Sequence, residues 1–183
     1  MSSADNQQER LEGQWIAGFV DGEGCFHVAI NRNCKMVTGY QVLPEVRIVQ
    51  HMKDVQILHR IRETLEMGVV RKNNGDRYEV RIRKLSELNK LIAFFEKYPL
   101  QTKKRRDFDL FKRVILLMNQ NVHLCSKGLF EIARLAAQMN TKKSSSFLES
   151  SETLRQTLGE TSEDKVRPSK RLEEVHRNMY SPS

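Results

Sequence analysis

The sequence predicts an α+β fold in which helices cover one face of a four-stranded antiparallel sheet. Hydrophobic periodicity along the 183 residues gives the order helix, two strands, helix, two strands, helix. Between the last two strands, residues 73–76 (Asn-Asn-Gly-Asp) are a strong signal for a β-hairpin turn, because Asn and Gly accept positive φ. The length and the 39% hydrophobic content are typical of one folded domain with a tail.

The first half of the predicted domain contains one helix and two strands. Residues 9–20 are predicted to form the helix because apolar side chains recur there about every four positions. Residues 25–31 and 41–50 alternate between apolar and polar side chains, which predicts two half-buried strands. Pro44 lies inside the second strand and favours an edge position or a bulge there.

The second half repeats this order and then continues as helices. Residues 54–67 form a predicted helix that Gly68 ends, and residues 69–72 and 78–83 form the two strands of the hairpin. Three further helices are predicted at residues 85–95, 104–119 and 127–139. We therefore expect an N-terminal arm at residues 1–10, a folded domain at 11–140, and a linker, a short helix at 151–158 and a mobile tail within 141–183.

Positive charge is concentrated in the predicted domain. Lys and Arg number 31 against 23 Asp and Glu, which gives a formal charge of +8, and residues 160–183 contribute five of each sign. The surplus lies mainly in residues 71–83 and 103–106. This favours a polyanionic partner such as nucleic acid, and a solvated basic face is the alternative. A sheet face carrying these side chains could lie in a DNA major groove, which admits a β-ribbon.

Other classes of protein are disfavoured by what the sequence lacks. No stretch approaches the roughly 20 apolar residues that span a bilayer, and residues 1–10 have no apolar signal-peptide core. The three cysteines show no CxxC or finger spacing that would indicate structural zinc. We expect a protein that is neither secreted nor inserted in a membrane, from an organelle (chloroplast or mitochondrion) or from a bacterial cytoplasm.

The end of the first predicted helix has an unusual composition. Gly18 and Gly22 lie four residues apart, which exposes bare backbone on one side and suggests close approach of another helix, although each glycine lowers helix stability by roughly 1 kcal/mol. Glu23 follows between two glycines, where a carboxylate can bind a hard divalent cation. Taken alone, the segment is more typical of a helix C-terminal turn with a solvated acid.

The nonapeptide at residues 16–24 (IAGFVDGEG) resembles the motif of the LAGLIDADG homing endonucleases. Residues 46–50, 68–71 and 98–104 resemble further segments of that family, so the resemblance extends over about residues 11–120. It implies an αββαββα fold with a saddle-shaped sheet that grips double-stranded DNA. We find one motif in the chain; in this family a single motif implies a homodimer with two active sites and a nearly palindromic target.

The resemblance also implies roles for individual residues. Glu23 corresponds to the final acid of the motif, which ligates the metal, although Asp is commoner there; the Gly22 carbonyl is the expected second ligand. The implied cofactor is Mg²⁺, with Mn²⁺ as a substitute. Gln50 aligns with the residue that orders solvent at the scissile phosphate. Lys103 aligns with the basic residue of the site, and the adjacent Lys104 leaves that register open.

Two larger sets complete the expectations. The expected dimer interface consists of Trp15, Gly18, Phe19, Asp21 and Gly22, with Asp21 in a structural role. The expected DNA-binding residues are His27, Ala29, Asn31, Asn33, Gln41, Arg47, Arg71, Asn73, Arg77, Glu79 and Arg81, with Lys104, Arg105 and Arg106 on backbone phosphates. Two alternatives use the same scaffold: a maturase that binds intron RNA, and a DNA-binding protein without catalytic activity.

Overall fold

The computed structural model describes residues 10–139, all within Met1–Leu148, one of the two units into which the chain divides. The predicted α+β fold and the order of its elements are confirmed. The elements are α1 (Gly13–Glu23), β1 (Gly24–Arg32), β2 (Tyr40–His51), α2 (Val55–Leu65), β3 (Val69–Lys72), β4 (Arg77–Ile82), α3 (Leu85–Lys97), α4 (Lys104–Asn119) and α5 (Ser126–Ala137), with short 3-10 turns η1 (Met52–Asp54) and η2 (Val122–Leu124). The predicted N-terminal arm, apart from Arg10, and the predicted helix at 151–158 lie outside the described residues.

The four strands form one antiparallel sheet in the order β1-β2-β4-β3. β2 is paired on both sides over part of its length, because β4 joins it only from Val46 onward. Pro44 pairs with Val28 of β1 and has no strand on its other side. Pro44 therefore lies in a part of β2 that is an edge of the sheet, as predicted, although the later part of β2 is central.

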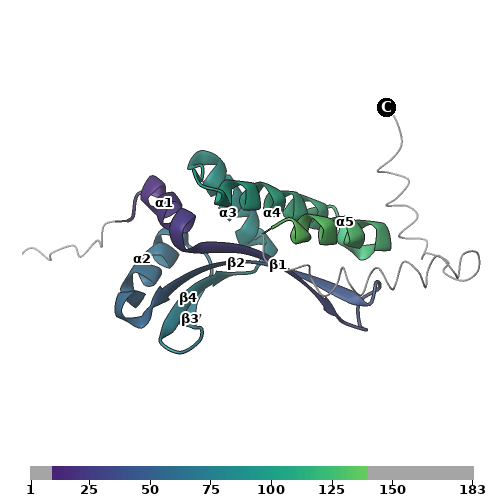
Figure 1. Cartoon of the computed structure of the whole chain (residues 1–183), viewed down its shortest axis with the longest axis horizontal. Helices are drawn as coiled ribbons and strands as arrows, with labels where there is room; N and C mark the ends of the chain where they lie inside the picture. The colour runs from purple at the N-terminus through teal and green to yellow at the C-terminus, as the bar shows by residue number, and fades with distance from the viewer. Residues whose placement is uncertain (1–9, 140–183) are drawn as a thin grey trace, which may run out of the picture. The chain divides into compact units, whose positions relative to one another are not determined.

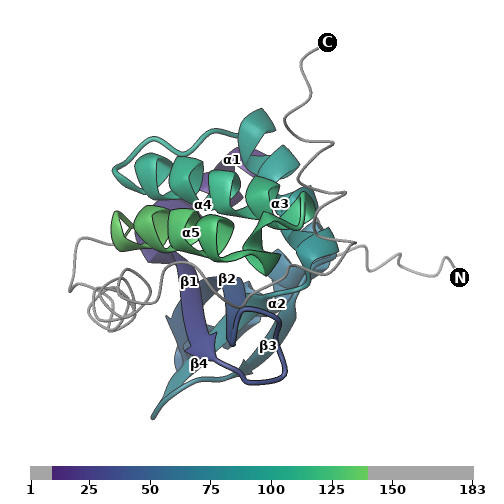
Figure 2. The ribbon, with the colours of Figure 1, turned by 90° about the vertical axis from the view of Figure 1, so that its right-hand side faces the viewer.

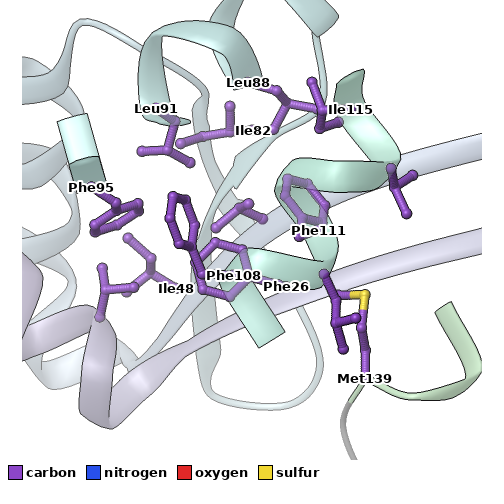
Figure 3. Packing of buried hydrophobic residues seen from close by; sticks show 14 of the residues in the cluster. Phe26, Ile48, Ile82, Leu88, Leu91, Phe95, Phe108, Phe111, Ile115 and Met139 are labelled. Carbon is purple, nitrogen blue, oxygen red and sulfur yellow. The ribbon is translucent and has the colours of Figure 1, made fainter. Parts of the chain in front are cut away.

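Helices α1, α3, α4 and α5 lie over one face of the sheet, and the opposite face carries no described helix (Figures 1 and 2). The core between the two layers is centred on Phe26, whose ring lies 5.4 to 6.0 Å from those of Phe111, Phe108 and Phe95 (Figure 3). Ile48 and Ile82 add the apolar side of β2 and β4 to this cluster. The alternate residues of each strand consequently face away from the helices.

The connection from α2 into β3 depends on backbone that a side chain would strain. Glu66 ends α2 with φ 54°, and Gly68 follows with φ 76°. A Cβ at Gly68 would lie 2.7 Å from Ile82 Cγ1. The helix therefore ends at Leu65, two residues before the predicted end at residue 67, and Gly68 lets β3 pack closely on β4. Among residues 10–139, no helix combines the length and the apolar character needed to cross a membrane.

Phe26 is the side chain on which the packing between the sheet and the helices depends most. We expect Phe26→Ala to lower the free energy of unfolding by about 3–5 kcal/mol, because the cavity left among three phenylalanine rings has no neighbouring group to fill it. Urea denaturation of the two proteins measures this. Val37→Ala, at an exposed position in the turn between β1 and β2, is the control and should change it by less than about 0.5 kcal/mol. Equal effects of the two substitutions would contradict this account of the core.

Candidate active site and nucleic-acid interface

The last turn of α1 presents oxygen atoms to solvent. Glu23 is the final helical residue and is exposed, and Gly22 beside it is also exposed, with no atom within 4 Å of where its Cβ would stand. The last carbonyl groups of a helix have no partner within the helix, so the backbone oxygens here are available unless another group donates to them. Gly24 then begins β1 and donates its N–H to the Val20 carbonyl.

Asp21 attaches this turn to the segment that precedes α4. Its carboxylate accepts hydrogen bonds from Gln101 N at 2.7 Å, from Thr102 Oγ1 at 2.8 Å and from Thr102 N at 3.3 Å. Both oxygens are therefore engaged within the chain, which agrees with the predicted structural role. The place of Asp21 at a dimer interface stays a prediction.

The ammonium of Lys104 lies at the end of α1. Lys104 Nζ donates to the carbonyl oxygen of Gly24, the residue directly after Glu23. The Lys103 side chain is exposed at the N-cap of α4 and makes no hydrogen bond or ion pair with the described residues, whereas its backbone carbonyl accepts from Arg106 N. The geometry therefore favours Lys104 as the basic group of the site. The resemblance in sequence had indicated the adjacent Lys103 and left the register between the two lysines open.

The strand register brings Gln50 toward the same place. Ile48 of β2 pairs with Gly24, where β1 begins, so Gln50 lies two residues beyond, alongside the point at which α1 ends. Strand alternation from the buried Ile48 turns Gln50 to the side of the sheet that α1 covers. Gln50 is half-buried and belongs to the neighbourhood of Glu23 and Lys104.

The donor atoms at this helix end suit a hard cation but do not complete its coordination. Carboxylate and carbonyl oxygens, here from Glu23 and Gly22, are ligands that Mg²⁺ prefers in proteins. Within residues 10–139 no three His, Cys, Asp or Glu side chains are grouped as a metal site. One chain therefore offers part of a site, which waters, phosphate oxygens and a second carboxylate would have to complete.

One side of α1 packs on the core and the other carries the residues predicted at a dimer interface. Ile16, Ala17 and Val20 are buried. On the other side, Trp15 and Phe19 stack with ring centroids 5.1 Å apart, and Trp15 is among the exposed large hydrophobic residues. Gly18 has open space around it, as Gly22 does. Large apolar rings beside bare backbone form a surface suited to close packing by another helix.

The sheet face opposite the helices gathers most residues predicted to bind DNA. Cross-strand rows on it include Cys25–Arg47–Arg81, His27–Glu45 and Asn31–Gln41. Burial and the nearby Arg47 lower the pKa of His27 below its usual value, which the Glu45 carboxylate offsets in part. The imidazole is therefore neutral at neutral pH and can both donate and accept a hydrogen bond.

Toward the β1–β2 turn the predicted residues form a smaller polar group. Asn33 Nδ2 donates to Gln41 Oε1 at 3.1 Å, and Ala29 lies opposite Leu43 on the same face. At the other hairpin, Asn73 and Arg77 are exposed beside the turn. On α4, the guanidinium of Arg105 lies 3.0 Å from Asp109 Oδ1 within its own helix.

Glu79 corrects the alternation prediction. It points to the predicted face, but it is 1% exposed and accepts a hydrogen bond from Arg71 Nε at 2.9 Å, so it does not offer its carboxylate to a base. Arg71 of the neighbouring strand β3 pairs with it. Alternation gives the direction of a side chain, whereas its burial depends on strand pairing that the sequence does not specify.

The model of the LAGLIDADG endonuclease family matches residues 16–115. The chain belongs to this family. It is 51% identical to I-TnaI, a homing endonuclease of known crystal structure, covering 83% of this chain and 99% of that one with a TM-score of 0.72. It is 31% identical to the meganuclease I-CpaMI, solved bound to uncleaved DNA, covering 87% of this chain and 52% of that one with a TM-score of 0.74.

A curated relative from Neurospora crassa, the probable intron-encoded endonuclease 3, is 35% identical over 129 residues. That alignment covers 69% of this chain and 24% of the relative. The chain thus spans about a quarter of that relative's length, whereas it spans nearly all of I-TnaI.

Two residues that were not among the predicted site residues also lie on the outward face of the sheet. Arg83 and Glu45 belong to the same outward face, and Arg83 Nε lies 3.3 Å from Glu45 Oε2. The sequence showed Glu45 as an outward strand residue and Arg83 as part of the basic cluster. Neither could be recognised as a site residue, because their meeting depends on β4 lying beside β2.

The contacts of Asp21 predict its effect on stability. We expect Asp21→Ala to lower the free energy of unfolding by about 1–2 kcal/mol, because three donors of Gln101 and Thr102 lose their acceptor. Urea denaturation measures the loss, and faster amide exchange at Gln101 and Thr102 locates it. Asp109→Ala removes only an exposed pair one helical turn from Arg105 and should cost about 0.5 kcal/mol or less. A loss no larger than that of the control would show that Asp21 does not hold this segment.

Proposed function

We propose that the chain is one half of a site-specific endodeoxyribonuclease that acts as a homodimer on a long, nearly palindromic double-stranded DNA target. The observation that carries the proposal is the hydrogen bond from the Lys104 ammonium to the carbonyl of Gly24, the residue that follows the exposed Glu23 at the end of α1. Membership of the LAGLIDADG family supports the reaction class. The Arg-bearing sheet face supports DNA as the substrate.

Glu23 and the Gly22 carbonyl would hold Mg²⁺, or Mn²⁺ in its place. The bound cation would supply charge stabilisation for phosphodiester hydrolysis and favour deprotonation of a bound water. The exposed position of both groups leaves room for the phosphate and for the corresponding carboxylate of a second subunit. Because a duplex has two strands and each chain brings one Glu23, cleavage of both strands calls for two chains.

Lys104 and Gln50 would contact the phosphate and the attacking water directly and would not be ligands of the metal. The Lys104 ammonium, held on the Gly24 carbonyl, can stabilise negative charge that develops on the scissile phosphate. The Gln50 amide can donate to and accept from a water, which would orient it for attack. Fixing these groups in advance is the main contribution that protein side chains make to such a reaction.

The homodimer would form through the stripe of Trp15, Gly18, Phe19 and Gly22. Two-fold packing of this stripe brings the two helix ends, and with them the two Glu23 side chains, to the symmetry axis. Each sheet would then read one half-site, and the matched surfaces account for a nearly palindromic target. We place the protein in an organelle or a bacterial cytoplasm, where intron-bearing genes would provide such targets.

Cleavage of a pool of randomised duplexes in Mg²⁺, followed by sequencing of the cut ends, tests the proposal. We expect the wild-type chain to cut a related set of sequences on both strands. Glu23→Gln should retain binding and lose at least about a thousandfold in single-turnover rate, because several kcal/mol of transition-state stabilisation disappear with the ligand. Glu12→Gln, at the other end of α1, is the control and should cut normally.

Binding without cleavage by the wild-type chain would contradict the nuclease and leave a silent DNA-binding protein. Preference for intron RNA over the DNA pool would instead favour a maturase. A monomer in solution that also remains single on DNA would remove the symmetric target.

The two adjacent lysines provide a matched pair for the catalytic assignment. We expect Lys104→Met to lower the single-turnover rate by about 10²–10³, because a charge directed at the reacting phosphate is lost. Lys103→Met should leave that rate nearly unchanged and, at most, weaken DNA binding in a salt-dependent way. The reverse pattern would restore the assignment made from the sequence alone.

A further inference from the structure

Two acidic side chains lie buried within the face that is proposed to receive DNA. Glu45 of β2 is 5% exposed and Glu79 of β4 is 1% exposed. Both point to the side of the sheet that carries Arg47, Arg71 and Arg81. A carboxylate on such a surface opposes the approach of phosphates, so its presence there needs a physical explanation.

Glu45 is the common partner of three arginines from two strands. Its Oε2 lies 2.7 Å from Arg81 Nε, 2.6 Å from Arg81 Nη2 and 3.3 Å from Arg83 Nε. Its Oε1 lies 3.3 Å from Arg47 Nε. One buried carboxylate therefore fixes guanidinium groups that would otherwise repel one another across β2 and β4.

Glu79 does the same for the outer strand. It accepts from Arg71 Nε at 2.9 Å and so connects β4 to the arginine of β3. The carboxylates are buried, whereas their arginine partners reach solvent: the side chains of Arg71 and Arg83 are 50% and 44% exposed. Arg71, Arg81 and Arg83 also line an open hollow of about 700 Å³ at the β3 edge, so their remaining donors face accessible space.

Stability alone gives a poor account of this network. Buried ion pairs contribute little net stability once desolvation is counted. Two of its atoms, Arg47 Nε and Glu79 Oε2, are buried without a hydrogen-bond partner among the described protein atoms, which is unfavourable. What the network does provide is a fixed orientation for four guanidinium groups and a reduced positive charge on the face.

We propose that Glu45 and Glu79 are positioning residues that set the DNA sequence discrimination of this surface. They hold Arg47, Arg71, Arg81 and Arg83 in advance in the orientations that base edges require, and they weaken the attraction of the same arginines to DNA of any sequence. The inference rests on the proposed DNA-cleaving function and extends it to residues that do not touch DNA.

Both halves of this proposal follow from how arginines bind DNA. Binding without sequence preference grows with the number of phosphate charges that the protein neutralises. Recognition of guanine needs two donors of one guanidinium aligned with O6 and N7. The two buried carboxylates beneath these arginines reduce the first contribution and favour the second, because the arginine side chains are already ordered before DNA arrives.

The test uses a duplex library with randomised positions, from which the wild-type chain enriches a sequence by binding in the absence of divalent metal. Affinities are then measured at several salt concentrations for the enriched duplex and for a scrambled duplex of the same composition. We expect Glu45→Gln and Glu79→Gln to bind scrambled DNA about threefold to tenfold more tightly, because each removes a negative charge from the face. Their preference for the enriched duplex should fall at least about tenfold.

Two further variants separate charge from position. Glu63→Gln removes an exposed carboxylate at the rim of the same hollow. No ion pair of Glu63 with an arginine is found among the described residues, so this substitution should strengthen binding to both duplexes equally and leave the preference unchanged. Glu45→Asp keeps the charge but shortens the reach to Arg47, Arg81 and Arg83. It should leave scrambled binding at the wild-type level and weaken binding to the enriched duplex.

Each result supports or overturns the inference. An unchanged preference in the Gln variants overturns it, and so does a parallel loss of affinity for both duplexes with a lowered unfolding midpoint, which would indicate a role in folding alone. If Glu45→Gln does not fold, Glu79→Gln and Glu45→Asp decide. Failure of the wild-type chain to enrich any sequence would overturn the proposed function instead.

Discussion

The candidate site depends on the three hydrogen bonds that the Asp21 carboxylate accepts from Gln101 and Thr102. α1 and α4 are 80 residues apart in the sequence at this point, and no strand pairing holds them together. Three donors on one carboxylate fix the end of α1 against the start of α4. Lys104, two residues beyond Thr102, then reaches the Gly24 carbonyl beside Glu23. Glu23 and the Lys104 ammonium thus lie at the same end of α1 because of a third residue, Asp21, which takes no part in the reaction we propose.

α1 performs two tasks because its residues divide between two sides. Ile16, Ala17 and Val20 anchor it in the core that Phe26 organises, while Trp15 and Phe19 remain outside with two glycines. Glycine is a poor helix former, and the three glycines of this 11-residue helix are tolerated because the buried side supplies stability through packing. An exposed apolar stripe on a helix that also carries Glu23 would connect the proposed subunit pairing to the assembly of a complete site.

The fold could be predicted almost entirely, because the elements have local signals: period-two alternation for β1 and β2, the Asn-Gly turn for the β3–β4 hairpin, and Gly68 for the break between α2 and β3. The site could be predicted only in part. Lys103 and Lys104 are successive residues where a helix begins, so their side chains point in directions about 100° apart, and choosing between them requires the exact helix start. Glu45 and Glu79 escaped prediction for a different reason: their burial arises from arginines on neighbouring strands, and a strand's own sequence does not show its neighbours.

The arrangement of charge on the sheet face indicates how affinity and discrimination are balanced. A face bearing Arg47, Arg71, Arg81 and Arg83 without acids would bind any duplex strongly, and in a dimer this excess would be doubled. Sequence discrimination is also doubled in a dimer, since each half-site contributes its own free-energy difference between right and wrong bases. Neutralising part of the charge lowers the affinity for DNA of any sequence, whereas ordering the guanidinium groups raises the discrimination between sequences. Buried carboxylates beneath exposed arginines change both in the direction that the proposed long target requires.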